Sequence, residues 1–148
     1  MQHDYYKEYY DLERNHWWFV AREKIIVNYI KLMIENKSLN NKDLKILNVG
    51  CGPGRSSQYL SDFGVVTSIE YDKDCCKFAS ERTGLEIFHG SITELQFEEN
   101  TFDLVCAFDV IEHVEDDKLA VSEMKRVAKK KWSFINYSSG FYEPVEPS

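Results

Sequence analysis

The sequence lacks any apolar run long enough to cross a bilayer, and it shows no N-terminal signal-peptide pattern. A membrane-spanning helix needs about 20 consecutive apolar residues, and a secretory leader needs a basic segment followed by an apolar one. We therefore expect a cytoplasmic protein in a reducing environment, with no membrane as a partner.

Cysteine is scarce, and its spacing fits neither a zinc site nor a disulfide framework. The four cysteines are Cys51, Cys75, Cys76 and Cys106. Zinc sites need closely spaced pairs with a short gap within each pair, and the adjacent Cys75 and Cys76 do not provide one. We predict no metal site, and we expect all four thiols to be buried as small apolar groups.

Positive charge is also in deficit, with 18 Lys and Arg against 25 Asp and Glu and a formal net charge of −7. Nonspecific binding to DNA or RNA needs a basic surface, so we expect no nucleic acid partner. The charge is compatible with a small-molecule substrate. A hydrophobic content of 43% over 148 residues is enough for a packed core.

Glycine is sparse, yet three of the seven glycines stand close together as Gly50, Gly52 and Gly54. They follow the apolar run 46–49, which is typical of a parallel strand covered on both faces. Without Cβ atoms, glycines allow positive φ and the close approach of a ligand. A second apolar strand ends at Glu70, whose carboxylate is placed to accept hydrogen bonds from ribose hydroxyls. The pattern predicts a nucleotide-type cofactor site.

The spacing of the glycines separates two classes of cofactor. A dinucleotide fingerprint would need Gly or Ala at position 55 or 57, and the sequence has Arg55 and Ser57 there. The G-x-G-x-G pattern instead resembles the first motif of the class I S-adenosylmethionine-dependent methyltransferases, which reads acid-x-G-x-G-x-G. The match covers residues 48–54 except at Asn48, where an amide replaces the usual carboxylate.

Two further segments resemble the same family. His16–Arg22, which reads H-W-W-F-x-x-R, is similar to the segment before the first strand in a subgroup of small-molecule methyltransferases. Phe102–Val114, F-D-x-V-x-x-x-D-V-x-E-H-V, is similar to the family's segment around the end of the fourth strand. The resemblance implies S-adenosyl-L-methionine as cofactor and methyl transfer to a small-molecule acceptor.

The resemblance also implies the site residues. Asp109 would lie by the reacting methyl group, and either His113 or Asp109 would act as a general base; His113 alternatively caps or packs. Ser91 stands where the family commonly has an acid that contacts adenine. The residues implied for cofactor binding are Asn48, Gly50, Cys51, Gly52, Gly54, Arg55, Glu70, Tyr71, Ser91, Ile92 and Phe108.

The alternation of strands and helices predicts an α/β fold, a Rossmann-like, doubly wound and mainly parallel sheet, over residues 37–148. Residues 1–36 are expected to form an N-terminal helical lid, with an amphipathic helix over about 19–36. Its aromatic cluster either packs in the core or closes over the ligands. Further helices are expected at 56–63, ended by Gly64, at 73–82, ended by Gly84, and from Asp116; strands are expected at 85–89 and from Leu104.

The end of the chain departs from the family pattern. The family usually has three more strands after the fourth, but only residues 132–137 suit a fifth strand, so we expect a C-terminally truncated domain. A shifted reading frame at the codons of Lys129–Lys131 is one explanation, because back-translation from Lys131 permits Ser-Gly-Val-Ser-Leu-Ile-Thr-Val-Pro, which suits the family. A truncated sheet would expose an edge through which two copies could form a homodimer.

Two rival functions stay open. The first is a cofactor-binding fragment without activity, which the missing strands, Asn48 and Ser91 favour. The second is a nicotinamide-dependent oxidoreductase, which Arg55 and Ser57 disfavour.

Overall fold

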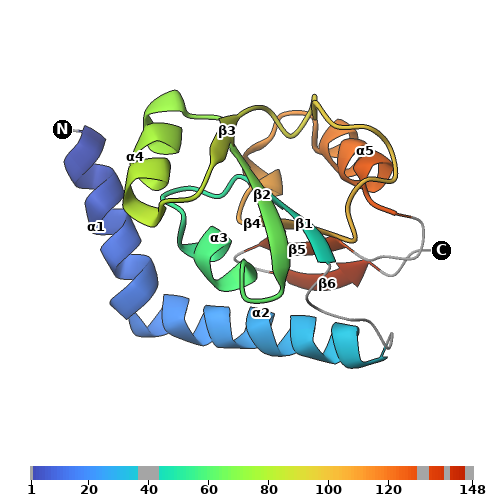
Figure 1. Ribbon diagram of the computed structural model, residues 1–148, viewed down its shortest axis with the longest axis horizontal. Helices are drawn as coiled ribbons and strands as arrows, with labels where there is room; N and C mark the ends of the chain where they lie inside the picture. The colour runs from blue at the N-terminus through green and yellow to red at the C-terminus, as the bar shows by residue number, and fades with distance from the viewer. Residues whose placement is uncertain (1, 37–43, 130–133, 139–140, 146–148) are drawn as a thin grey trace.

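A computed structural model of the chain describes residues 2–36, 44–129, 134–138 and 141–145. Its centre is a six-stranded sheet with the order β3-β2-β1-β4-β5-β6, and helices cover both faces (Figure 1). Five strands are parallel, and β6 runs antiparallel to β5. The strands are β1 (Leu44–Val49), β2 (Gly64–Glu70), β3 (Ile87–His89), β4 (Leu104–Phe108), β5 (Phe134–Ser138) and β6 (Phe141–Val145). The predicted Rossmann-like, mainly parallel α/β fold is confirmed.

Alternate residues of the central strands pack in two separate hydrophobic cores, one on each face of the sheet. Ile46 and Leu104 pack with helices α2 (Trp17–Asn36) and α3 (Arg55–Leu60). Leu47 and Val105 point to the opposite face, where α5 (Asp117–Val127) covers them. Because successive side chains of a strand alternate between faces, β1 and β4 are apolar on both sides. This double covering holds the carboxyl ends of both strands in place.

The helix α4 (Lys73–Thr83) closely matches its predicted range. Its N-cap is Asp72, whose carboxylate accepts hydrogen bonds from the backbone N–H groups of Asp74 and Cys75. Gly84 ends the helix with φ of 70°, as predicted.

The helix expected to reach Phe63 ends earlier, at Leu60. Gly64 does not end that helix but begins β2. A Cβ at this position would lie 2.3 Å from the carbonyl oxygen of Leu44, so the glycine serves the close approach of β1 and β2. The strand expected at 85–89 is also shorter and spans Ile87–His89.

The two N-terminal helices have different neighbours. Tyr6 and Tyr10 of α1 (Gln2–Asn15) pack against Cys75 and Phe78 of α4, and Figure 1 shows the two helices side by side. In contrast, α2 lies against the sheet, and its Ile30 is fully buried in the same core as β1 and β4. Residues 2–36 therefore share contacts with the rest of the domain, and the action of the N-terminal segment as a lid stays a prediction.

The C-terminal strands confirm one prediction from the sequence and show that another was wrong. The predicted fifth strand is present as β5, which pairs parallel with β4 from Val105↔Phe134 to Phe108↔Tyr137. A sixth strand, which was not expected, forms from Phe141 to Val145. It returns antiparallel beside β5, which a short connection allows. The segment 130–133, where the shifted frame would begin, lies outside the described residues.

Within the described part of the chain, no helix is both long and apolar enough to cross a membrane. In the same part, no three or more His, Cys, Asp or Glu side chains come together in a way that could hold a metal ion. All four cysteines are unpaired and buried, as predicted.

Candidate active site

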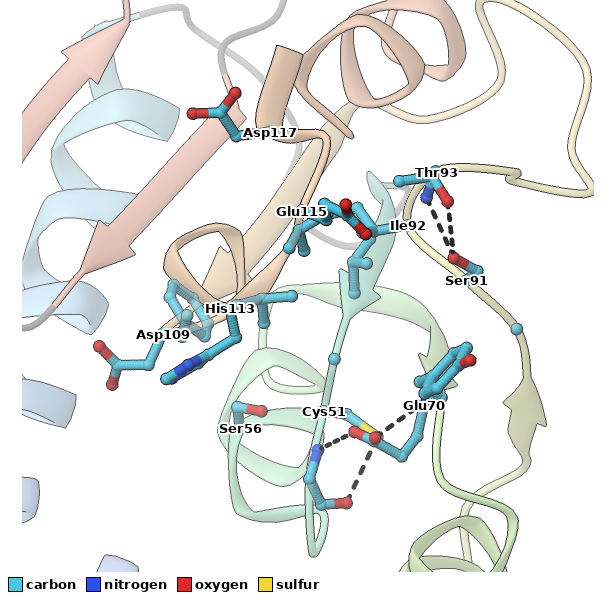
Figure 2. Close-up of a pocket in the computed structure, with 18 of the residues that line it drawn as sticks. Cys51, Ser56, Glu70, Ser91, Ile92, Thr93, Asp109, His113, Glu115 and Asp117 are labelled. Carbon is cyan, nitrogen blue, oxygen red and sulfur yellow. Dashed lines mark hydrogen bonds between the residues drawn. The ribbon is translucent and has the colours of Figure 1, made fainter. Parts of the chain in front are cut away.

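A cleft of about 1140 Å³ opens at the carboxyl ends of β1, β2 and β4. This is where open α/β sheets bind ligands. Figure 2 shows Asp109 and His113 on one side of it and Ser91, Ile92 and Thr93 on the other, with Cys51 and Glu70 nearby. The predicted site residues that line the cleft are Gly50, Cys51, Gly52, Glu70, Tyr71, Ser91, Ile92, Phe108, Asp109 and His113.

The glycine loop after β1 has the left-handed conformations that its sequence predicts. The φ angles of Gly50 and Gly52 are 69° and 54°. A Cβ on Gly50 would lie 2.4 Å from a methyl carbon of Val110, whereas a Cβ on Gly52 would meet no atom within 4 Å. Gly50 is therefore needed for packing of the loop against the segment after β4, and Gly52 leaves open space within the cleft.

Glu70 is fixed at the edge of the cleft by three backbone donors. Its Oε2 accepts a hydrogen bond from the N–H of Gly52 at 2.8 Å. Its Oε1 accepts bonds from the N–H groups of Tyr71 and Asp72 at 2.9 and 3.2 Å. A carboxylate has about four acceptor positions, so Glu70 retains capacity for a hydroxyl donor from a ligand.

Three predicted cofactor-binding residues lie outside the cleft lining. Asn48 is fully buried, and its amide donates hydrogen bonds to the hydroxyls of Ser56 and Ser57 at 2.8 and 3.0 Å. Since Ser56 does line the cleft, Asn48 is joined to the cleft through that hydroxyl. Arg55 forms a two-point ion pair with Glu23 of α2, at 3.1 and 2.7 Å. Gly54 is the N-cap of α3.

Cys51 is the one cysteine that lines the cleft, among the part of the chain that the structure describes. Burial and the nearby charge of Glu70 raise the pKa of its thiol well above the usual range. The thiolate is the nucleophilic form of cysteine. The raised pKa therefore disfavours a nucleophilic role for Cys51.

The side of the cleft expected to hold adenine is built from the segment after β3. The hydroxyls of Ser91 and Thr93 lie 2.9 Å apart, and the N–H of Thr93 donates to the Ser91 hydroxyl at 3.3 Å. Tyr71 directly follows β2. Its ring centre lies 6.3 Å from that of His89, and it is 75% exposed. These groups offer hydroxyls and one exposed aromatic face to a planar ligand.

At the opposite end of the cleft, Asp109 follows β4 with a left-handed φ of 54°. Its carboxylate accepts a hydrogen bond from the guanidinium of Arg22 in α2. The Arg22 guanidinium also stands over the rings of Trp18 and Phe19, at 5.4 and 5.1 Å from their centres. The aromatic tract of the sequence thus positions an arginine beside the candidate catalytic acid.

Three cleft residues from the N-terminal helices, Tyr9, Glu13 and Arg22, were not predicted as site residues. Arg22 stood within a matched motif, but no role followed from the motif. Tyr9 and Glu13 carried no signal, because their helix lies far from the glycine loop in the sequence and only its docking on α4 brings them to the cleft.

Glu13 is a buried acid that lines this cleft. Burial raises its pKa to about 7, although the charge of Arg22 opposes that rise. Its Oε1 lies 3.8 Å from Arg22 Nη2, which is too long for a hydrogen bond. The carboxylate is thus buried near a cation that does not hydrogen-bond to it.

His113 ends the short 3₁₀ turn Ile111–His113 that follows β4. Its side chain lines the cleft and is exposed to solvent. In Figure 2 its ring lies between Asp109 and the glycine loop. The structure therefore brings both candidate bases to the same end of the cleft.

A parallel α/β sheet with a glycine loop after β1 and an acid at the end of β2 defines a nucleotide-cofactor domain. The family model of the Methyltransferase domain matches residues 47–135, more than half of the chain. The chain belongs to this family of methyltransferase domains.

Two curated relatives are each 33% identical. Demethylmenaquinone methyltransferase of Staphylococcus aureus matches over 96 residues, which are 60% of this chain and 40% of the relative. An uncharacterised protein of Methanocaldococcus jannaschii matches over 116 residues, which are 76% of this chain and 48% of the relative. The chain thus spans about half the length of the curated relatives it matches.

Two solved structures share most of the fold. A proposed S-adenosyl-L-methionine-dependent methyltransferase of Methanococcus maripaludis superposes with a TM-score of 0.75 at 18% identity, covering 90% of this chain and 62% of that one. A protein of Pyrococcus horikoshii superposes with a TM-score of 0.69 at 26% identity, covering 89% and 62%. At 18% identity, the likeness to the Methanococcus maripaludis structure shows a shared fold and nothing about activity.

Proposed function

We propose that the protein transfers a methyl group from S-adenosyl-L-methionine to a small-molecule acceptor. The observation that carries this proposal is the arrangement of one cleft, with Glu70 and the glycine loop at one end and Asp109 and His113 at the other. The family match supports methyl transfer.

The residues of the cleft suit this cofactor. Glu70 keeps acceptor capacity for a ribose hydroxyl, and the space beside Gly52 admits a ligand close to the backbone. Ser91, Ile92 and the exposed ring of Tyr71 would hold the adenine. The cofactor supplies a methyl group on a sulfonium, which leaves as a neutral thioether.

The remaining task of the protein is to hold the acceptor in line and to receive its proton. Positioning of this kind contributes several kcal/mol, on the order of 7 in favourable cases. His113 and Asp109 both line the cleft and are the groups proposed to receive the proton, and His113 has the exposure that proton exchange with solvent requires. We expect Asp109→Asn and His113→Ala to slow turnover more than they weaken cofactor binding.

The first experiment is a calorimetric titration of the 148-residue chain with S-adenosylhomocysteine and, separately, with NAD. We expect S-adenosylhomocysteine to bind and NAD not to bind. Glu70→Ala should weaken that binding by about tenfold or more, because a charge-assisted hydrogen bond is lost. Glu81→Ala on the exposed face of α4 is the matched control and should change nothing. Tighter binding of NAD would reject the proposal in favour of an oxidoreductase.

The second experiment asks whether the chain is active. Methyl transfer to any acceptor by the purified chain would remove the alternative of an inactive cofactor-binding fragment. In the Asp109 and His113 variants, a large loss of cofactor affinity with unchanged turnover would reject the catalytic role. Because Asp109 is paired with Arg22, unfolding curves of both variants must accompany the kinetics.

A further inference from the structure

The cleft carries an excess of negative charge. Two cationic side chains, Arg22 and Lys118, line it within the described residues. The acidic lining residues are Glu13, Glu70, Asp109, Glu115, Asp116 and Asp117. A cleft lined mainly by one sign of charge concentrates ligands of the opposite sign. The cleft therefore favours a cationic ligand over an anionic one.

Glu13 adds a specific binding group to this general preference. Its side chain is only 10% exposed, and it lines the cleft. Its Oε2 is buried and has no hydrogen-bond partner among the residues that the structure describes. Buried carboxylate oxygens nearly always accept hydrogen bonds, and leaving one without a donor is costly. A ligand that donates a hydrogen bond would remove this cost.

Arg22 is held away from a close contact with Glu13. Its guanidinium donates to Asp109 and is stacked on the rings of Trp18 and Phe19. These contacts leave Glu13 Oε1 at 3.8 Å from Arg22. Tyr9, one helical turn before Glu13, also lines the cleft. An aromatic face beside a carboxylate is a favourable setting for an ammonium group.

We propose that the methyl acceptor is an amine, and that its ammonium form binds at Glu13 and Tyr9. This inference rests on the proposed methyl transfer and specifies its substrate class. Binding requires only that the ammonium donates to Glu13 Oε2, so it is measurable without turnover.

The chemistry of transfer to an amine balances with groups in the cleft. The ammonium first loses a proton to His113 or Asp109, which leaves a lone pair on nitrogen. That lone pair forms the bond to the methyl carbon, and the carbon–sulfur bond breaks with its electrons staying on sulfur. The products are a methylated ammonium and a neutral thioether, and the proton passes to solvent.

The test compares two probes of the same shape, benzylamine, a cation at neutral pH, and uncharged benzyl alcohol. Their dissociation constants are measured by NMR shift titration of the full chain, with and without S-adenosylhomocysteine. We expect benzylamine to bind about tenfold tighter than benzyl alcohol. Glu13→Gln should remove most of that preference, while Glu8→Gln, an equal change of charge on the exposed face of α1, should keep it.

Two results would overturn the proposal. One is a wild-type chain that binds benzylamine no better than benzyl alcohol, including no binding of either. The other is a Glu13→Gln variant that keeps its benzylamine affinity but loses affinity for S-adenosylhomocysteine, which would assign Glu13 to the cofactor. Failure of S-adenosylhomocysteine to bind the wild type would instead reject the proposed function. The titration of benzylamine without S-adenosylhomocysteine tests amine binding independently of that result.

Discussion

The guanidinium of Arg22 in α2 and the carboxylate of Asp109 after β4 form an ion pair across 87 residues of sequence. The Arg22 side chain is 8% exposed and the Asp109 side chain 21%. Both residues line the cleft. The pair therefore ties an N-terminal helix to the segment that carries the candidate catalytic groups.

Removing Arg22 should destabilise the whole domain. Arg22→Ala removes the cation beside the partly buried Asp109 and the buried Glu13, and the loss of one partner of a buried pair costs about 3 kcal/mol or more. Urea unfolding measures the change. Arg82→Ala is the control, because Arg82 lies 4.0 Å from Asp11 and both side chains are largely exposed. Its effect should stay within about 1 kcal/mol, and equal effects of the two substitutions would contradict the assignment.

The stability of the domain should fall as the pH rises from about 4.5 to about 7 because of Glu13. The pKa of this carboxyl is raised from 4.5 to about 7 by burial, so in this window the folded state holds a proton that the unfolded state has released. The loss in the free energy of unfolding is on the order of 3 kcal/mol, and it levels off above the pKa that Glu13 has in the folded state. Glu13→Gln should remove this part of the pH dependence in unfolding curves recorded from pH 4 to 8. Glu8→Gln should retain it, and an unchanged profile in Glu13→Gln would show that Glu13 is not responsible.

The two glycines of the loop should respond differently to alanine. Gly50→Ala places a Cβ 2.4 Å from Val110 at a positive φ, so we expect a loss of stability well above the 1–2 kcal/mol or so of left-handed strain alone. Gly52→Ala meets no atom within 4 Å and should cost about that strain energy. Adding Val110→Ala to Gly50→Ala should recover part of the stability in thermal unfolding. No recovery would mean that backbone strain, and not the contact with Val110, dominates.

The contact between α1 and α4 should depend on Asp72. Its carboxylate caps α4 and accepts a hydrogen bond from the hydroxyl of Tyr6 at 2.7 Å. Asp72→Ala should cost about 1–2 kcal/mol, whereas Asp72→Asn keeps a capping oxygen and should cost less. The Tyr6 hydrogen bond lowers the pKa of Asp72 below its usual value. The stability that the Asp72 carboxylate contributes is therefore complete above the pKa that Asp72 has in the unfolded chain. It is lost as the pH falls through the lowered pKa of the folded state. Comparing acid unfolding of the wild type with that of Asp72→Asn would measure this contribution.

Much of the sheet follows from local sequence, but its end does not. The glycine loop, Glu70 and the apolar strands predict a βαβ unit because each residue type constrains its own backbone or burial. The sixth strand from Phe141 to Val145 was missed. A short segment that contains Pro144 has no clear strand pattern, and only pairing with β5 places it in the sheet.

The site shows the same division. Glu70, Asp109 and His113 were identifiable, because motifs at strand ends place them at the carboxyl edge. Asn48 was expected at the cofactor, and this stays a prediction; its side chain is buried and donates to Ser56 and Ser57. Its position in the motif did not predict these two hydrogen bonds.

The sequence alone determined the fold class and the glycine loop, and it predicted Glu70 as the ribose-binding acid, because these depend on residue type and short-range spacing. Only the tertiary structure decided that Tyr9, Glu13 and Arg22 reach the cleft. Their place depends on how α1 and α2 pack against α4 and the sheet. That packing sums many weak contacts between residues far apart in the chain, and no local pattern encodes it.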